Sequence, residues 1–164
     1  MEYNPLENNW VLWFHNISDN DYSINSYTKV FEFNTVEEYL SLINKIDNFG
    51  SGMFFFMKQG IEPIWENKEN INGGYWSFKV SKKNINDIWF KLSSQIIGNN
   101  FVKDFENNQY INGISLSPKI NNCIIKIWMN ENQNNKNIFN IDYLENICKE
   151  NLFNETKYFK YKNQ

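Results

Sequence analysis

The chain has 164 residues, of which 41% are hydrophobic, and this length and apolar content are typical of one folded domain with its own core. Its formal net charge of −3 excludes a protein that coats nucleic acid through bulk positive charge, so any contact with nucleic acid must be local. No apolar run approaches the roughly 20 residues that a transmembrane helix needs, and the first residues lack the basic and apolar regions of a signal peptide.

The N-terminal third is predicted to begin with two strands and a helix. Residues 9–14 are rich in aromatic residues and predict a strand, and the alternating residues 27–33 predict a second one after a polar loop at 16–25. Thr35 and Glu38 have the spacing of a capping box, which predicts a helix that starts directly after Thr35. The apolar residues at helical spacing in it are Val36, Tyr39, Leu40, Ile43 and Ile46.

A long loop separates the next two predicted strands, at 53–58 and 75–80. The loop covers residues 60–74 and contains Trp65. Asn84 can cap a second helix, because the residues after it are apolar at helical spacing. The predicted buried face of this helix consists of Ile85, Ile88, Trp89, Leu92 and Ile96.

The last third is predicted to contain a hairpin, a helix and a strand. Residues 111–117 and 123–129 flank a turn and predict the hairpin. Residues 130–137 are of low complexity, so we expect a mobile loop there. Residues 138–152 predict a third helix, and residues 157–162 predict a final strand.

The order of these elements indicates an α+β fold. Several connections between strands are too short for parallel crossovers, so we predict one antiparallel sheet that carries the three helices on one face. The other face must then meet solvent or a ligand. No internal repeat or linker interrupts the chain, and residues 1–164 are expected to form a single domain.

The residue patterns of known catalytic and metal sites are missing from the sequence. His15 is the one histidine, and we expect it to be structural or exposed. The sequence holds no HExxH motif, P-loop, dinucleotide fingerprint or cluster of metal ligands. Cys123 and Cys148 stand apart and fit no disulfide framework, which indicates a reducing compartment, cytosol or nucleus. We therefore expect a protein that is not an enzyme and that needs no metal or cofactor.

The composition points to the source rather than to the chemistry. The chain contains 31 Asn residues and neither Arg nor Ala, as AT-rich codons would encode. We therefore expect a virus or a divergent protist as the source, with many of the Asn residues on the surface.

Trp65 and Glu66 form an unusual pair, because a large apolar residue stands directly before a carboxylate on a long loop. The alternative interpretation is that Trp65 packs into the core and that Glu66 is solvated. Spacing alone favours this alternative.

Several segments match the motifs of one family in the same order and at nearly the same spacing, from residue 4 to about residue 130. They are NPLENNWVLWF at 4–14, FNTVEEY at 33–39, GIEPIWE at 60–66 and GGYW at 73–76, with further matches at 89–101 and 124–128. The chain thereby resembles the eukaryotic translation initiation factor 4E family, which binds the 5′ cap of mRNA. This resemblance implies a curved sheet with three helices on its convex face and a cap-binding cleft on its concave face.

The resemblance also implies the roles of single residues. A 7-methylated guanine is positively charged and binds between two aromatic rings. Trp65 corresponds to one of these rings, and Tyr22 is the candidate for the other, where the family usually has Trp. Glu66 corresponds to the carboxylate that accepts hydrogen bonds from the guanine. Trp128 corresponds to the tryptophan that contacts the N7-methyl group.

The expected phosphate site departs from the family. Its three basic positions fall on Lys119, Asn121 and Ile124, so only Lys119 keeps its charge, and Tyr75 stands where the family usually has Arg. Lys126 could point into the same cleft, because it shares strand parity with Trp128, or it could be a solvated edge lysine. Lys160 and Lys162 could close over the phosphates. Contacts to the first nucleotides of the mRNA are expected from Tyr75, residues 121–122 and residues 158–162.

On the helical face, the family docks a helical peptide of a scaffold or repressor protein. Pro5, Leu6 and Val36 are kept there, and Leu40 replaces an expected tryptophan. Phe90 and Ile97 lie off the predicted core stripe and could form the partner groove. Lys91 stands at an acidic position and Ser94 at a leucine position of the family.

The favoured hypothesis is therefore a monomeric, cytoplasmic cap-binding protein that promotes translation initiation, in the host cytoplasm if the source is viral. One alternative is a cap-binding repressor or competitor that recruits no scaffold. The other is an interaction module that has lost cap binding.

Overall fold

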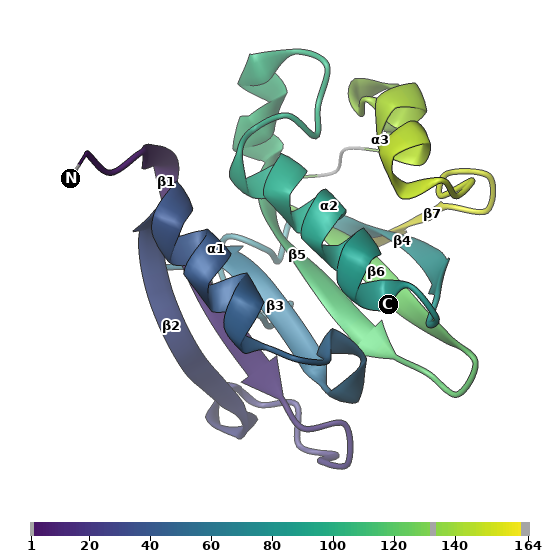
Figure 1. The fold of residues 1–164 in the computed structure, drawn as a ribbon. Helices are drawn as coiled ribbons and strands as arrows, with labels where there is room; N and C mark the ends of the chain where they lie inside the picture. The colour runs from purple at the N-terminus through teal and green to yellow at the C-terminus, as the bar shows by residue number, and fades with distance from the viewer. Residues whose placement is uncertain (1, 132–133, 162–164) are drawn as a thin grey trace.

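The computed structural model describes residues 2–131 and 134–161. In this part of the chain, seven strands form one antiparallel sheet in the order β2-β1-β3-β5-β6-β4-β7, and three α-helices lie on its convex face (Figure 1). The predicted fold class is confirmed. The bounds are β1 Pro5–His15, β2 Tyr27–Thr35, α1 Val36–Lys45, β3 Met53–Lys58, β4 Gly74–Ser81, α2 Ile85–Ile97, β5 Ile111–Pro118, β6 Asn122–Met129, α3 Ile141–Cys148 and β7 Lys157–Lys160.

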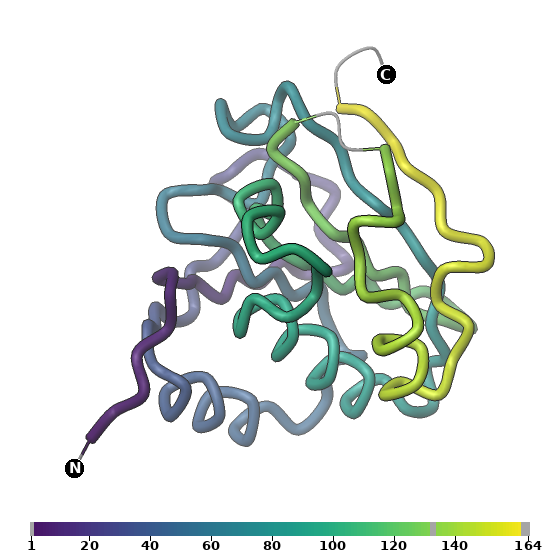
Figure 2. The backbone as a smooth tube through the Cα atoms, turned by 90° about the horizontal axis from the view of Figure 1, so that it is seen from above, coloured from purple at the N-terminus to yellow at the C-terminus, as the bar shows by residue number. Residues whose placement is uncertain are grey.

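The helices gather on one side of the sheet, and the loop between β3 and β4 projects on the other side (Figure 2). No helix among the described residues is long and apolar enough to cross a membrane.

Helix α1 starts with the predicted capping box. The Thr35 side chain accepts a hydrogen bond from the Glu38 amide, and the Glu38 carboxylate accepts one from the Thr35 amide, both at 3.2 Å. Tyr39 is buried as predicted, together with Leu42.

Helix α2 lies between α1 and α3, as Figure 1 shows, and buries a wider face than predicted. Ile96 and Ile97 are both only 2% exposed, so the expectation that Ile97 contributes to a partner groove is wrong. A helix with neighbours on two sides needs a broader apolar stripe than one that covers a sheet alone. Asn84 occupies the N-cap position of α2, but its side chain makes no capping hydrogen bond.

The C-terminal elements are shorter than predicted. Helix α3 ends at Cys148, because Lys149 adopts a left-handed backbone conformation with φ of 53°. The final strand ends at Lys160. Lys162, a predicted phosphate contact, lies outside the described residues, as does part of the loop predicted at 130–137.

Strand β3 is apolar on both faces. Phe54 and Phe56 belong to the main core beneath the helices. Phe55 and Met57 point to the concave face and form a second, smaller cluster with Trp128 and Tyr161. Because no α-helix among the described residues covers this face, the loops that cross it must shelter this cluster.

Candidate functional site

A cavity of about 400 Å³, the concave cavity, opens on the concave face of the sheet. Its walls come from the β1–β2 loop, the β3–β4 loop and the inner side chains of the sheet. The cavity brings together five of the residues expected at the site, namely Tyr22, Trp65, Glu66, Lys126 and Trp128.

Two glycines bracket the β3–β4 loop, which carries Trp65 and Glu66. Gly60 has φ of 85°, a left-handed conformation that lets the chain turn away from β3. Gly73 lies so close to the backbone of Met129 that a Cβ atom would collide with its carbonyl. The loop therefore leaves the sheet and returns to it at positions that a larger side chain would disturb.

Buried amides hold the middle of this loop. The Asn70 side chain donates hydrogen bonds to the carbonyls of Glu62 at 3.1 Å and Ile64 at 2.9 Å. Its own oxygen accepts a hydrogen bond of 2.8 Å from Asn112 on β5, which also bonds to the Glu69 carbonyl at 2.8 Å. Asn70 is completely buried and Asn112 is 3% exposed, so the expectation of surface Asn residues fails for this pair.

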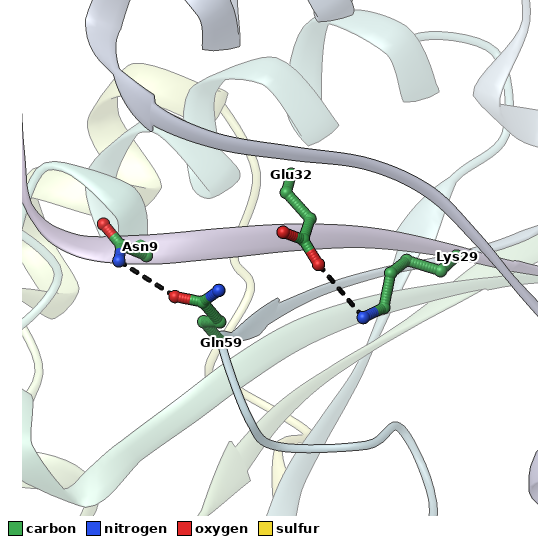
Figure 3. Close-up of polar contacts among 4 residues, drawn as sticks. All are labelled: Asn9, Lys29, Glu32 and Gln59. Atoms are coloured by element: carbon green, nitrogen blue, oxygen red, sulfur yellow. Dashed lines mark hydrogen bonds and ion pairs between the residues drawn. The ribbon is translucent and has the colours of Figure 1, made fainter.

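The root of the loop is tied to β1. The Asn9 side chain donates a hydrogen bond of 2.9 Å to the Gln59 side chain, and the Gln59 amide donates one of 2.9 Å to the Asn9 carbonyl (Figure 3). In the same view, Lys29 forms an ion pair of 3.0 Å with Glu32 on β2. Its ammonium also lies 5.4 Å from the ring centroid of Trp13. The two Asn9–Gln59 hydrogen bonds therefore fix the point where the loop leaves the sheet.

The Trp65 side chain is 47% exposed at the mouth of the concave cavity. The alternative that Trp65 packs into the core is therefore wrong. Glu66 is exposed beside it and lines the same cavity. A large ring and a carboxylate are thus presented together to any ligand that enters.

Tyr22 presents a second exposed ring from the β1–β2 loop, with 54% of the residue accessible. It stacks on His15 with ring centroids 4.9 Å apart and an interplanar angle of 11°. His15 is buried, as a structural residue would be, and its Nε2 lies 2.8 Å from the Asp21 carbonyl oxygen, to which it can donate. The His15 ring therefore supports Tyr22 from behind.

The floor of the concave cavity is aromatic and largely buried. Trp128 is 6% exposed, and its indole N–H donates a hydrogen bond of 2.9 Å to the Ser115 hydroxyl. Phe55 meets the Trp128 ring edge-on at 6.1 Å. Tyr27 also lines the cavity, and burial, with smaller contributions from Tyr22, Glu66 and Asp21, raises the pKa of its phenol to about 12. The phenol of Tyr27 is therefore neutral at physiological pH.

Tyr161 closes the floor near the C-terminus, whereas the sequence placed it in the segment 158–162 that is expected to contact the first nucleotides of the mRNA, not in the cap pocket. It is 7% exposed, and its hydroxyl has no hydrogen-bond partner among the described residues. Burial raises the pKa of this hydroxyl well above its ordinary value, so it stays a neutral donor. The apolar residues on both faces of β3 were the available signal for a sheltered floor, although they do not point to Tyr161.

Lys126 supplies the cation of the concave cavity. Its side chain points inward with Trp128, as strand parity predicted, and its ammonium lies 4.3 Å from the ring centroid of Tyr75. Burial, and next the nearby charge of Lys119, lower the pKa of Lys126. An anionic ligand would offset both effects, because a nearby negative charge favours the charged form of a lysine.

The other expected phosphate contacts lie apart from this cavity. Lys119 and Asn121 are exposed at the β5–β6 turn and are not part of the cavity lining. Among the residues that the structure describes, no group of three or more His, Cys, Asp or Glu side chains could hold a metal ion.

On the convex side, an exposed apolar strip crosses α1 and α2. Val36, Leu40 and Phe90 are 37%, 41% and 36% exposed, and the ring of Phe90 stacks on that of Tyr39 at 6.3 Å. Pro5 pairs with Thr35 at the start of β1, next to the half-buried Leu6. The sheet separates this strip from the concave cavity.

Residues 5–164 match the family model of eukaryotic initiation factor 4E. The chain is 31% identical to initiation factor 4E-3 of Caenorhabditis elegans over 76% of its own length and 53% of that protein, and 31% identical to initiation factor 4E of Candida albicans over 76% and 63%. It thus spans about half to two thirds of the length of these curated relatives.

Solved structures share the fold. A complex of Caenorhabditis elegans eIF4E-3 with the 4E-binding protein Mextli and a cap analogue has a TM-score of 0.82 at 25% identity, with 98% of this chain and 94% of that chain covered. A complex of Ascaris suum eIF4E-3 with the m7G cap has a TM-score of 0.81 at 24% identity, with 99% and 94% covered.

The buried amide of Asn70 generates a prediction about the β3–β4 loop. Asn70→Ala removes three hydrogen bonds and leaves buried partners unpaired, which should lower the free energy of unfolding by about 1–3 kcal/mol. It should also make the loop more sensitive to proteolysis. The matched control is Asn72→Ala, an exposed residue of the same loop. Equal unfolding midpoints in urea for the two variants would contradict this account of the loop.

Proposed function

The chain belongs to the eukaryotic initiation factor 4E family, and on this premise we propose that its concave cavity binds the 7-methylguanosine cap of mRNA and that the protein thereby promotes translation initiation. The observation that carries the proposal is the meeting of two exposed rings, Tyr22 and Trp65, with the carboxylate of Glu66 over a buried aromatic floor. We propose the cytoplasm as its place of action.

The proposed recognition follows from the charge of the ligand. Methylation at N7 gives the guanine a delocalised positive charge, and electron-rich rings attract a cation that lies over their faces. Trp65 and Tyr22 would enclose the base from the two loops. His15 behind Tyr22 supports this role, because a ring fixed in advance loses little side-chain entropy when the ligand binds.

Glu66 would read the edge of the base. A guanine presents two N–H donors on one edge, and a carboxylate offers two acceptor oxygens in a matching geometry. Trp128 would contact the N7-methyl group from the floor. Its indole N–H is already used by Ser115, so its contribution to this contact would be apolar.

Lys126 is the proposed main contact for the phosphates inside the cavity. Its low-polarity surroundings strengthen an interaction with an anion. Lys119 would act from the rim, where solvent weakens its charge. The hydroxyl of Tyr161 is a further donor that a phosphate or sugar oxygen could accept from.

The convex strip is the proposed docking site for a helical peptide from a scaffold or repressor protein. Its residues Val36, Leu40 and Phe90 are apolar and exposed, as a site for the apolar face of a helix requires. Leu6 and Pro5 would extend it toward β1. Ile97 has no part in this proposal, because it is buried.

The first experiment tests the pocket with 7-methyl-GTP resin. Trp65→Ala should abolish retention, because a stacked base–aromatic contact contributes about 1–3 kcal/mol and one ring of the pair would be missing. Glu66→Gln should weaken retention, because it keeps the shape but loses the charge. The controls are Phe105→Ala, a ring outside the cavity that is 64% exposed, and Glu69→Gln on the same loop. Normal retention of Trp65→Ala and Glu66→Gln would remove this assignment.

The second experiment separates the two faces. Phe90→Asp puts a charge into the apolar convex strip, which a docked peptide would bury without a partner charge. Binding of a helical peptide with the motif Tyr-x-x-x-x-Leu-Φ, where Φ is an apolar residue and which the family's partners carry, should therefore fall at least about tenfold in an anisotropy titration. Retention on 7-methyl-GTP resin should stay normal, which also shows that the variant folds. The control is Phe105→Asp, a change at an exposed ring outside the convex strip. Loss of cap binding in a folded Phe90→Asp protein would contradict the separation of the faces.

A further inference from the structure

Strand β4 aligns two kinds of side chain across the outer part of the sheet. In the register, Tyr75 of β4 is opposite Trp128 of β6 and Phe159 of β7. Ser77, two residues further along β4, is opposite Lys126 and Lys157. Residues two apart on a strand point to the same face. The concave face therefore carries two neighbouring rows across the strands. One row is aromatic, and the other has Ser77 in the middle and a lysine at each end.

The aromatic row is continuous from the concave cavity to the edge of the sheet. Tyr161 lies 5.4 Å from Trp128 and 5.2 Å from Tyr75, measured between ring centroids. Tyr75 in turn stacks on Phe159 at 5.2 Å with an interplanar angle of 21°. Phe159 is 40% exposed, so the row ends in a ring that can accept a further stacking partner.

Lysines also extend from the concave cavity toward the edge of the sheet at β7. Lys126 lies inside the concave cavity, and Lys157 and Lys79 line a second cavity of about 680 Å³, the edge cavity, together with Phe159 and one acidic residue, Glu155. Within the part of the chain that the structure describes, none of these three lysines forms an ion pair. Their charges are therefore available to an anionic ligand.

We propose that the edge of the sheet formed by β4, β6 and β7 is a binding track for the nucleotides that follow the cap, with a base stacked on Phe159 and the backbone phosphates on Lys157 and Lys79. Aromatic platforms beside cations are how proteins bind single-stranded nucleic acid without reading its sequence. The track starts at Tyr75 and Lys126 in the concave cavity, so the proposal rests on the proposed cap binding.

This track accounts for the depleted phosphate site. Asn121, Ile124 and Tyr75 stand where cations are expected from the family, and Tyr75 is also the centre of the aromatic row. The replacement of a cation by a ring would move part of the binding free energy from the triphosphate to the bases beyond it.

The test compares the affinities of 7-methyl-GTP and of capped RNA with three nucleotides beyond the cap, both by calorimetry. The wild-type protein should bind the capped RNA more tightly. Phe159→Ala should reduce the ratio of the affinity for capped RNA to the affinity for 7-methyl-GTP about fivefold or more, as expected for the loss of one stacked base. Lys157→Ala should reduce the salt dependence for the capped RNA by about 0.7 in the slope of log K against log salt concentration, the value for one phosphate of a single strand.

The controls are Phe105→Ala, an exposed ring away from both cavities, and Lys45→Ala, a lysine at the end of α1. Both should keep the wild-type ratio and salt slope. The proposed track would be overturned if the wild-type protein bound the two ligands with equal affinity. It would also be overturned if the affinity ratio of Phe159→Ala equalled that of Phe105→Ala. Either result would leave the proposed cap binding intact. A wild-type protein that binds neither ligand would overturn the proposed cap function itself.

Discussion

In the part of the chain that the structure describes, the α-helices cover only the convex face of the sheet, so the apolar side chains on the concave face depend on loops for shelter. Phe55, Met57 and Trp128 would otherwise expose a large apolar surface to water. The β3–β4 loop closes over this face through the buried amides of Asn70 and Asn112. The loops that the core requires are the same loops that present the proposed ligand-binding rings, so stability and recognition are coupled at this face.

The two rings differ in how the fold supports them, and the difference bears on recognition. Trp65 lies on a loop that begins and ends at glycines and is held in the middle by buried amides. Tyr22 sits on a polar loop and relies on stacking with His15. A smaller ring on a supported loop can still form one side of a sandwich, because the attraction depends on the position of the ring face as well as on its size.

Periodic patterns and capping signals predicted most of the fold. The capping box of Thr35 and Glu38 predicted α1, and the turn between the segments 111–117 and 123–129 predicted the hairpin, because these signals act within a few residues of each other. The burial of Ile97 could not be predicted in this way, because it depends on the packing of α2 into a core whose other members are distant in sequence. The roles of Asn70 and Asn112 were missed for the same reason, since a buried amide and a surface amide look alike in a sequence rich in Asn.

The site residues that belong to one sequence motif could be predicted. Those that reach the site through the pairing of distant strands could not. Trp65 and Glu66 stand together on one loop, and the parity of Lys126 followed from its strand. Tyr161 reaches the cavity only because β7 pairs with β4, a contact that joins residues far apart in the chain. Asn121, Ile124 and Tyr75 stand at positions where the family has basic residues. Nothing in the sequence around them indicates which side chains take over the phosphate contacts.

The central claim is that the concave cavity recognises the positive charge of a methylated guanine. Its most direct test is a calorimetric titration of the unmodified protein with 7-methyl-GTP and with GTP under the same conditions. The account predicts that 7-methyl-GTP binds roughly tenfold or more tightly, because cation–π attraction in a desolvated site contributes about 2 kcal/mol. Equal affinities for the two nucleotides would contradict it.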